Sequence, residues 1–262
     1  MFRLQPTDEE QAKEAAKFAV DHSAGAIWVV EDVVTNFVYS NYLAQEFVKQ
    51  VQLEMKPSKV LLWTTNREVP FPEAVKALGI NWVFFAGSWS NGVILIRQVK
   101  EIWKDKPNKP TVLLSASCAH PELLKEGGAD MKGAYLIDPM PASQFLKEGF
   151  GHWGIRASQL SIDLIQDAND NFEDLSREKG GLWSTLRGFV GVHWVADARN
   201  ALRTLMEHAV NDPEEHFYYL DGQKYSFKRD GTGTNPAFYM WRVSNDIKFT
   251  DIAAVAANNA GE

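Results

Sequence analysis

Short hydrophobic runs alternate with longer amphipathic stretches through the first 140 residues of the chain. The runs cover 26–30, 59–63, 81–86, 111–114 and 134–137. Strands that alternate with helices predict a parallel sheet, so we expect an α/β fold of the Rossmann-like or flavodoxin-like kind. The run at 81–86 is apolar at every position from Trp82 to Ala86, as is typical of a central parallel strand.

The stretches between these runs read as helices. Leu43, Phe47 and Val51 recur every four residues and predict a buried face on a helix over 37–54. Thr7 followed by Glu10 has the pattern of a capping box and predicts a helix start. Further helices are expected over about 88–103 and 120–126, with a short one at 70–78. The regular alternation ends at residues 138–141, where two prolines cannot continue a central strand.

The second half of the chain has a different pattern. Apolar spacing predicts helices near 155–175, 180–188 and 194–209, and short β runs follow at 217–219, 225–227 and 238–243. Asp221-Gly222 and Asp230-Gly231 are hairpin-type turn sequences. We expect the alanine- and asparagine-rich tail after Asp251 to be mobile.

Composition excludes several classes of function. The 262 residues carry a net charge of −7 and no cluster of basic residues, which argues against nucleic-acid binding. The single cysteine, Cys118, excludes an intramolecular disulfide and is read as a small buried residue rather than a reactive thiol. The start of the chain has no signal-peptide pattern, and no apolar run is long enough to span a membrane. As written, the chain is expected to be cytoplasmic.

Polar residues follow the ends of the predicted strands. Parallel strands present their carboxyl ends at one edge of the sheet, where such folds bind ligands. A small polar ligand needs convergent hydroxyl groups, backbone N–H groups and an aromatic wall. For Ser88 and Ser90 the alternative explanation is that they cap a helix, which is the more common role of serine at such positions. The candidate ligand-binding residues are Asp32, Tyr39, Thr64, Ser88, Trp89, Ser90, Ser117 and Asp138.

No pattern indicates catalysis, a metal or a cofactor. The six histidines are dispersed without the HxH or HxxxH spacing of metal ligands. A nucleophile elbow, a dinucleotide-binding motif and a phosphate-binding loop are also missing. We therefore predict a protein that is not an enzyme and has no cofactor.

The order of these segments resembles the type 1 periplasmic binding proteins, the branched-chain amino-acid-binding (LivJ-like) class of ABC-transporter solute receptors. The segment from Trp82 to Gly87 with Leu95-Ile96-Arg97-Gln98 is similar to a strand and helix of that family's second lobe. Further similar segments are 2–8, 26–32 with Tyr39, 121–124 with 133–135, and 225–227 with 230–231, 235–236 and Tyr239. The resemblance extends over nearly the whole chain, but the first part of lobe one, which should precede Phe2, has no counterpart.

This resemblance implies a domain organisation and a role. Residues 1–145 with 236–250 would form an α/β ligand-binding lobe, residues 150–215 a helical segment returning to the other lobe, and residues 216–235 a β hairpin. The chain, whole or as a fragment, would capture a small polar ligand, such as an amino acid or a related organic anion, for an ABC importer. Its partner would be an ABC permease or a membrane receptor, and its location periplasmic.

Two alternatives remain open at this point. The first is a ligand-sensing or protein-interaction module derived from the fold, in which helices left without lobe one fold back or form a homodimer. The second is a cytoplasmic enzyme on a flavodoxin-like sheet, with Cys118 or Asp138 as the catalytic residue. The family's lobe-two acidic residue that meets a ligand's amino group has no match between Ser115 and Cys118, so Asp32 and Asp138 are the nearest substitutes.

Overall fold

The computed structural model describes residues 6–35, 37–54, 59–65, 79–148, 218–220, 223–225 and 238–255. The chain divides into two compact units, one of residues 7–150 with 237–262 and the other of residues 1–6 with 151–236. In the second of these the described part is a pair of antiparallel strands, β6 (Tyr218–Leu220) and β7 (Gln223–Tyr225). Leu220 pairs with Gln223, as the hairpin predicted at Asp221-Gly222 requires. The predicted helices over 70–78 and 150–215 lie outside the described residues.

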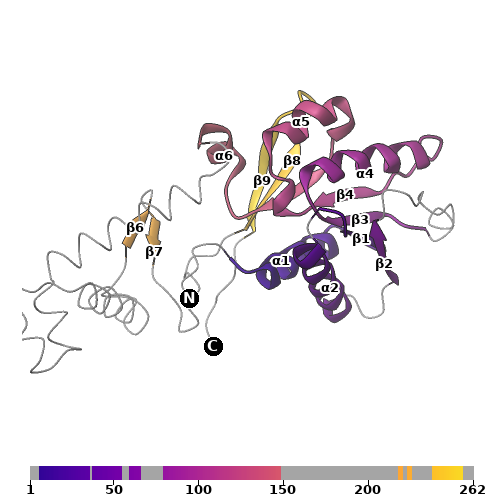
Figure 1. Ribbon diagram of the computed structural model, residues 1–262, viewed down its shortest axis with the longest axis horizontal. Coiled ribbons are helices and arrows are strands. Elements are labelled where there is room, and N and C mark those ends of the chain that lie inside the picture. Colours follow the sequence, from indigo (N-terminus) through magenta and orange to yellow (C-terminus); the bar gives the residue numbers. More distant parts are fainter. Residues whose placement is uncertain are drawn as a thin grey trace, which may run out of the picture. The chain divides into compact units, whose positions relative to one another are not determined.

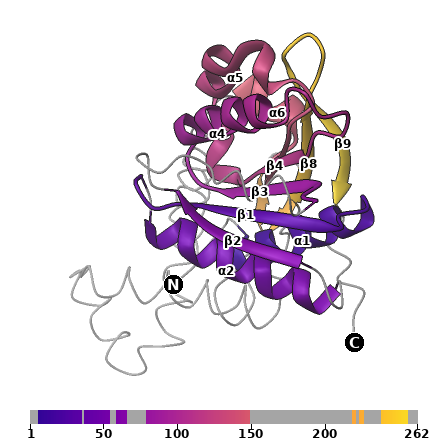
Figure 2. The ribbon, with the colours of Figure 1, turned by 90° about the vertical axis from the view of Figure 1, so that its right-hand side faces the viewer.

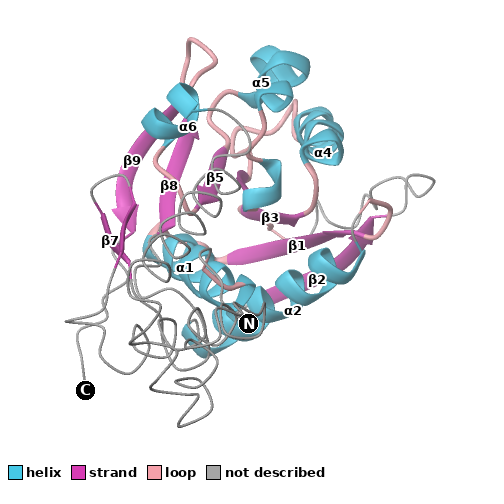
Figure 3. Ribbon diagram, turned by 60° about the vertical axis from the view of Figure 1, so that its left-hand side comes forward, coloured by secondary structure: helices cyan, strands magenta, loops and turns pink. Residues whose placement is uncertain are grey.

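The first unit is built on one mixed sheet of seven strands in the order β2-β1-β3-β4-β5-β8-β9. Strands β1 to β5 are mutually parallel, whereas β8 runs antiparallel to β5 and β9 antiparallel to β8. Figure 3 shows β5, β8 and β9 side by side at one margin of the sheet. The strands are β1 (Ala26–Asp32), β2 (Lys59–Thr65), β3 (Trp82–Ala86), β4 (Thr111–Leu114), β5 (Tyr135–Asp138), β8 (Phe238–Val243) and β9 (Phe249–Val255).

Helices cover both faces of this sheet, which confirms the predicted α/β class. Helices α1 and α2 pack together on one face, and α4 and α5 lie on the other (Figures 1 and 2). The helices are α1 (Asp8–Asp21), α2 (Phe37–Glu54), α4 (Trp89–Ile102), α5 (Pro121–Gly127) and α6 (Ala142–Glu148), with short 3₁₀ turns at Ala116–Cys118 and Gly128–Met131. Among the described residues, none of these helices is long and apolar enough to cross a membrane.

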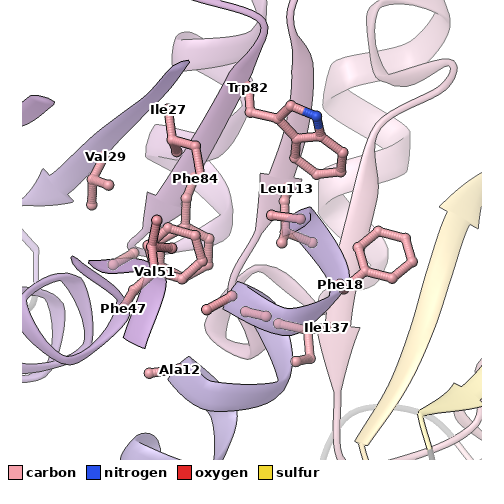
Figure 4. Packing of buried hydrophobic residues seen from close by; sticks show 14 of the residues in the cluster. Ala12, Phe18, Ile27, Val29, Phe47, Val51, Trp82, Phe84, Leu113 and Ile137 are labelled. Carbon is pink, nitrogen blue, oxygen red and sulfur yellow. The ribbon is translucent and has the colours of Figure 1, made fainter. Parts of the chain in front are cut away.

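The core on the α1–α2 side is made by alternate residues of the central strands. Ile27 and Val29 of β1 and Phe84 of β3 face Phe47 of α2, whose ring stacks on Phe84 with centroids 3.9 Å apart (Figure 4). The other residues of the same strands are buried too, since β1 and β3 are buried at every position. This two-sided burial is why both strands read as continuous hydrophobic runs.

The predicted helix start at Thr7 is confirmed as a capping box. Thr7 Oγ1 accepts from the Glu10 N–H at 3.1 Å, and Glu10 Oε2 accepts from the Thr7 N–H at 2.8 Å. The two bonds satisfy backbone donors that the first helical turn leaves without partners. Helix α1 therefore begins where local sequence chemistry places it.

Two elements in this unit differ from the sequence-based expectation. The tail was expected to be mobile after Asp251, but β9 continues to Val255 in the sheet. Helix α6 follows Pro141, where we predicted only a connection. Both owe their stability to a partner distant in sequence: β9 pairs with β8, and the first N–H groups of α6 bond to Asp251. Local periodicity carries no information about such partners.

Candidate functional site

The strand order creates a topological switch point between β1 and β3. After β1 the chain forms β2, which lies on one side of β1 in the sheet. Strands β3, β4 and β5 follow on the other side of β1. Connections leave the carboxyl ends of β1 and β3 in opposite directions, and ligands of open α/β sheets bind in the crevice so formed. Asp32 ends β1 and Gly87-Ser88 follows β3, so two of the predicted segments meet at this point.

Asp32 is completely engaged in binding its neighbours. Its Oδ1 accepts from the N–H groups of Val34 and Thr35, each at 3.1 Å. Its Oδ2 accepts from the N–H of Ser88 at 3.2 Å, from Ser88 Oγ at 2.9 Å and from Asn91 Nδ2 at 2.9 Å. Burial pushes the pKa of Asp32 upward, but the bonds from Asn91, Thr35 and Ser88 outweigh it and hold the pKa below its usual range. The carboxylate thus ties the β1 turn to the start of α4.

The start of α4 carries further polar groups. Ser88 is the N-cap residue, yet its hydroxyl bonds to Asp32 rather than to the helix backbone. Ser90 Oγ lies 3.4 Å from Ser88 Oγ. Asn91 donates to Asp32 and to Thr35 Oγ1, and its buried Oδ1 has no partner among the described residues. A buried acceptor without a protein donor is a natural place for a water molecule or a ligand donor.

An aromatic pair lies beside these hydroxyl groups. The ring of Trp89 stacks on that of His120 with centroids 5.1 Å apart and planes 13° from parallel. His120 is the N-cap of α5, where its Nδ1 accepts from the Glu122 N–H at 3.2 Å. In neutral His120 this bond places the ring proton on Nε2. Trp89 and His120 are both partly exposed and provide a flat apolar surface at the carboxyl edge.

A second polar cluster surrounds the carbonyl of Gly87. That oxygen accepts from Ser115 Oγ at 3.3 Å, from Ser117 Oγ and from Cys118 Sγ at 3.1 Å. Burial raises the pKa of Cys118 above its usual range, so its thiol is an inert donor inside the protein. The cluster joins the ends of β3 and β4.

Tyr39 extends this second cluster from α2. Its hydroxyl donates to Gln11 Oε1 at 3.3 Å. Burial raises the pKa of Tyr39 to about 12, against the opposing effect of bonds with Ser117 and Ser115. The phenol therefore stays neutral and serves as a hydrogen-bonding group rather than a charge.

The two remaining candidates lie apart from the switch point. Asp138 ends β5, two strands away from β3, where its buried Oδ1 accepts from the Met140 N–H at 2.9 Å. Burial raises the pKa of Asp138 well above its usual range, although the bond from Met140 opposes the effect. Thr64 lies in β2, where its Cα pairs with Glu31 of β1. The structure thus gathers Asp32, Ser88, Trp89 and Ser90 at one place and leaves Asp138 outside it.

Sequence inspection did not single out three residues that complete this arrangement. Asn91 occupies the first turn of α4, Thr35 the β1 turn, and His120 the start of α5. Thr35 lies near Asp32 through the local turn after β1, whereas Asn91 lies near it only because β1 and β3 are adjacent in the sheet. Polar residues in the turn after a strand and in the first turn of a helix are the one local signal that could have found them.

The surface next to the β1 turn is apolar. Val34, Phe37, Val38 and Tyr42 are exposed between 46% and 79%. Val34 belongs to the turn held by Asp32, and the other three open α2. The carboxyl edge therefore combines hydroxyl and amide groups, the carboxylate of Asp32, an aromatic pair and exposed apolar side chains. Within the described ranges, no group of three or more metal-binding side chains comes together.

No protein-family model matches the sequence, and no curated protein matches it significantly. Solved structures do resemble it in fold. The leucine-binding protein LivK from Thermotoga maritima is 14% identical with a TM-score of 0.66, over 97% of this chain and 67% of that one. A substrate-binding protein of an ABC transporter from Desulfitobacterium hafniense, in complex with Leu, is 12% identical with a TM-score of 0.59, over 96% and 67%.

A third similar structure is the solute-binding protein of an ABC transporter from R. palustris in complex with benzoate. It is 9% identical with a TM-score of 0.59, over 97% of this chain and 64% of that one. The chain thus spans about two thirds of the length of these proteins. At these identities the likeness concerns the fold, and it confirms the fold resemblance expected from the sequence: the chain has the α/β fold of the type 1 periplasmic binding proteins.

Proposed function

We propose that this chain is a solute-binding module that holds a small organic anion at the carboxyl edge of its sheet, between the ends of β1 and β3. The observation that carries the proposal is the arrangement at the start of α4. There Ser88 and Ser90 lie beside the Trp89–His120 stack at the topological switch point. A ligand with an apolar body and a carboxylate would find a flat surface for the first and the Ser90 hydroxyl as a donor for the second, because the Ser88 hydroxyl already donates to Asp32.

An organic anion fits this edge better than an amino acid. An α-amino group needs a carboxylate with spare acceptor capacity, but the two oxygens of Asp32 already accept five hydrogen bonds. The raised pKa of Asp138 favours its neutral form, and it lies away from the switch point. The solved structures of similar fold include one in complex with Leu and one in complex with benzoate, so the fold accommodates both kinds of ligand.

The similar proteins are parts of ABC transporters. By analogy, we propose that the domains predicted from the sequence are a ligand-binding lobe and segments belonging to a second lobe. The partner would then be a permease or a membrane receptor, and the chain would act outside the cytoplasm. A sensing role without transport would use the same site.

Enzymatic activity is the weaker alternative. Of the two candidate catalytic residues, Cys118 and Asp138, the first is fully buried and its thiol donates a hydrogen bond to the Gly87 carbonyl. Burial also raises its pKa, which disfavours the reactive thiolate. Known proteins of similar fold are transport binding proteins.

Calorimetric titration of the full chain with benzoate and with leucine tests the proposal. Benzoate is expected to bind and leucine to bind at least about tenfold more weakly, since one unpaired ammonium group costs this much or more. Trp89→Ala is expected to weaken benzoate binding about tenfold through loss of stacking, whereas Trp89→Phe retains most of the affinity. The proposal fails if neither probe binds, if leucine binds as tightly as benzoate, or if Trp89→Ala has no effect.

A further inference from the structure

A cavity of about 180 Å³ lies at the opposite, amino-terminal edge of the sheet. Its walls come from the second half of α4, the start of β4 and the segment that leads into β5. This volume is below the roughly 300–1,000 Å³ of ordinary ligand pockets, so an occupant would be small. Because the cavity is at the other end of the strands, it is separate from the switch point.

Lysine side chains dominate the rim of this cavity. Lys100, Lys109 and Lys132 line it together with a single carboxylate, Asp130. Asp130 is already paired, because Arg97 Nε lies 3.3 Å from its Oδ2 and Lys100 Nζ lies 3.7 Å from its Oδ1. Lys109 and Lys132 are therefore in excess over the acidic groups of the cavity. Such a concentration of positive charge is unexpected in a chain of net charge −7.

The two excess lysines come from segments that precede neighbouring strands of the sheet. Lys109 lies just before β4 and Lys132 just before β5, and these two strands are parallel neighbours. The segment before β5 is held in place by backbone bonds from Gly133 N–H to the Val243 carbonyl and from Ala134 N–H to the Met131 carbonyl, each within 3.0 Å. Gly133 has a φ of 81°, a conformation that glycine adopts without strain. The backbone that carries Lys132 is thus already ordered for binding.

The floor of the cavity is apolar. It consists of the buried side chains of Ile96 and Val99 from α4, Val112 from β4, Ala134 just before β5, and Pro110. An inorganic anion would gain nothing from this floor, whereas the hydrocarbon part of an organic acid would be removed from water on it.

We propose that this cavity is a second ligand site, which binds a small organic dianion with its two negative groups at Lys109 and Lys132 and its compact apolar body on the floor. The inference does not depend on the function proposed for the carboxyl edge. The ligand expected at the amino edge has two negative charges and a short apolar body. An effector of this class would bind on the same unit as the first ligand, at the far ends of the same strands.

Titration of the full chain with succinate, inorganic phosphate and butyrate tests the proposal. Succinate carries two charges and a hydrocarbon body, phosphate lacks the body, and butyrate lacks one charge. Succinate is expected to bind most tightly, and its affinity should fall as salt is added because the lysines are exposed to solvent. Amide NMR signals of Thr111, Lys132 and Gly133 should shift on titration.

Paired variants separate this cavity from general charge effects. Lys109→Ala/Lys132→Ala is expected to weaken succinate binding about tenfold, since each exposed charge pair contributes modestly. Lys104→Ala/Lys125→Ala removes the same charge from exposed positions outside the cavity and should leave binding within about twofold. Trp89→Ala should also leave it unchanged, which distinguishes failure here from failure at the carboxyl edge. Undetectable binding, equal binding of phosphate and succinate, or equal weakening in both double variants would overturn the proposal.

Discussion

Asp138 is a buried carboxyl group whose structure favours the neutral form. It is 7% exposed, at the end of β5, and it accepts a hydrogen bond from the Met140 N–H. Burial raises its pKa well above the usual range. For an acid whose pKa is raised by folding, stability is complete below the unfolded pKa near 3.8 and is lost as pH rises towards the folded pKa.

Asp138→Asn is therefore expected to stabilise the protein at neutral pH. Asparagine keeps an oxygen for the Met140 N–H but cannot ionise, so the free energy of unfolding should rise by roughly 1–3 kcal/mol at pH 7. At pH 3.5 the two proteins should differ much less. Urea unfolding at the two pH values measures this, with Asp105→Asn as an exposed control. A loss of stability at pH 7 would contradict the assignment.

Gly87 follows β3 at a point where the backbone passes close to Asp32, and this close approach requires glycine. A Cβ atom at Gly87 would overlap Phe85 Cζ and would lie 2.5 Å from Asp32 Cβ. Gly87→Ala should therefore displace the Phe85 ring or the Asp32 network and cost about 2–4 kcal/mol. Gly25→Ala is the matched control, because its nearest contact would be Asn81 at an ordinary 3.7 Å. Thermal unfolding of both variants tests this, and equal stabilities would count against the close approach.

At the scale of elements, the antiparallel margin of the sheet holds the end of the first unit together. β8 pairs with β5, β9 pairs with β8, and Trp241 of β8 donates its Nε1–H to the Met140 carbonyl at 2.8 Å. Asp251 of β9 then accepts from the N–H groups of Ala142 and Ser143, at 2.6 and 3.2 Å. A residue from the last strand thus caps a helix more than a hundred positions earlier.

Asp251→Ala is expected to remove this cap. Loss of a capping carboxylate costs about 1 kcal/mol, and the effect should be concentrated in α6 and β9 because these are the two elements that the bonds of Asp251 join. Hydrogen exchange should show faster exchange at Ala142 and Ser143 and little change in β1 and β3. Asp251→Asn, which keeps an acceptor oxygen, should lose about half as much. Uniform loss of protection across the sheet would show that the role of Asp251 is not a local cap.

At the scale of the whole molecule, the first unit is assembled from two separate stretches of chain. Residues 7–150 and 237–262 cluster together, while residues 151–236 belong to the other unit. The core of the first unit includes Phe238 and Met240 of β8 with residues of α1 and α2. A domain with its own core and its own contacts is expected to fold alone.

Joining residue 150 to residue 237 through a flexible linker of about ten glycine and serine residues, which spans roughly 15–20 Å on average, should therefore give a folded protein. Cooperative urea unfolding and a dispersed NMR spectrum would be the expected result.

The chain shortened at residue 236 is the complementary variant. It lacks β8 and β9, which would expose Leu136 and Ile137 of β5, so we expect it to bind a hydrophobic dye and to aggregate. Cooperative folding of this shortened chain would contradict the role assigned to the margin.

The amino-acid sequence by itself determined the local elements and their class. The four-residue spacing in α2 and the continuous hydrophobic runs of β1 and β3 place these elements correctly, and the Thr7–Glu10 pair places the start of α1. These signals are local, because side-chain periodicity and capping depend on neighbours within one or two turns. They are readable without knowing what packs against each element.

Only the tertiary structure decided which of these elements meet. Asp32 binds Ser88 and Asn91, which follow it by 56 and 59 residues, because β1 and β3 are adjacent in the sheet. The same strand order leaves Asp138 away from the switch point, and strand pairing brings Asp251 to the start of α6. Hydrophobic burial is non-directional and needs only a periodic pattern, whereas a hydrogen bond needs one particular donor and acceptor in contact. For that reason the core and several candidate site residues could be predicted from the chain, whereas the partners of those residues, such as Asn91 for Asp32, could be identified only from the fold.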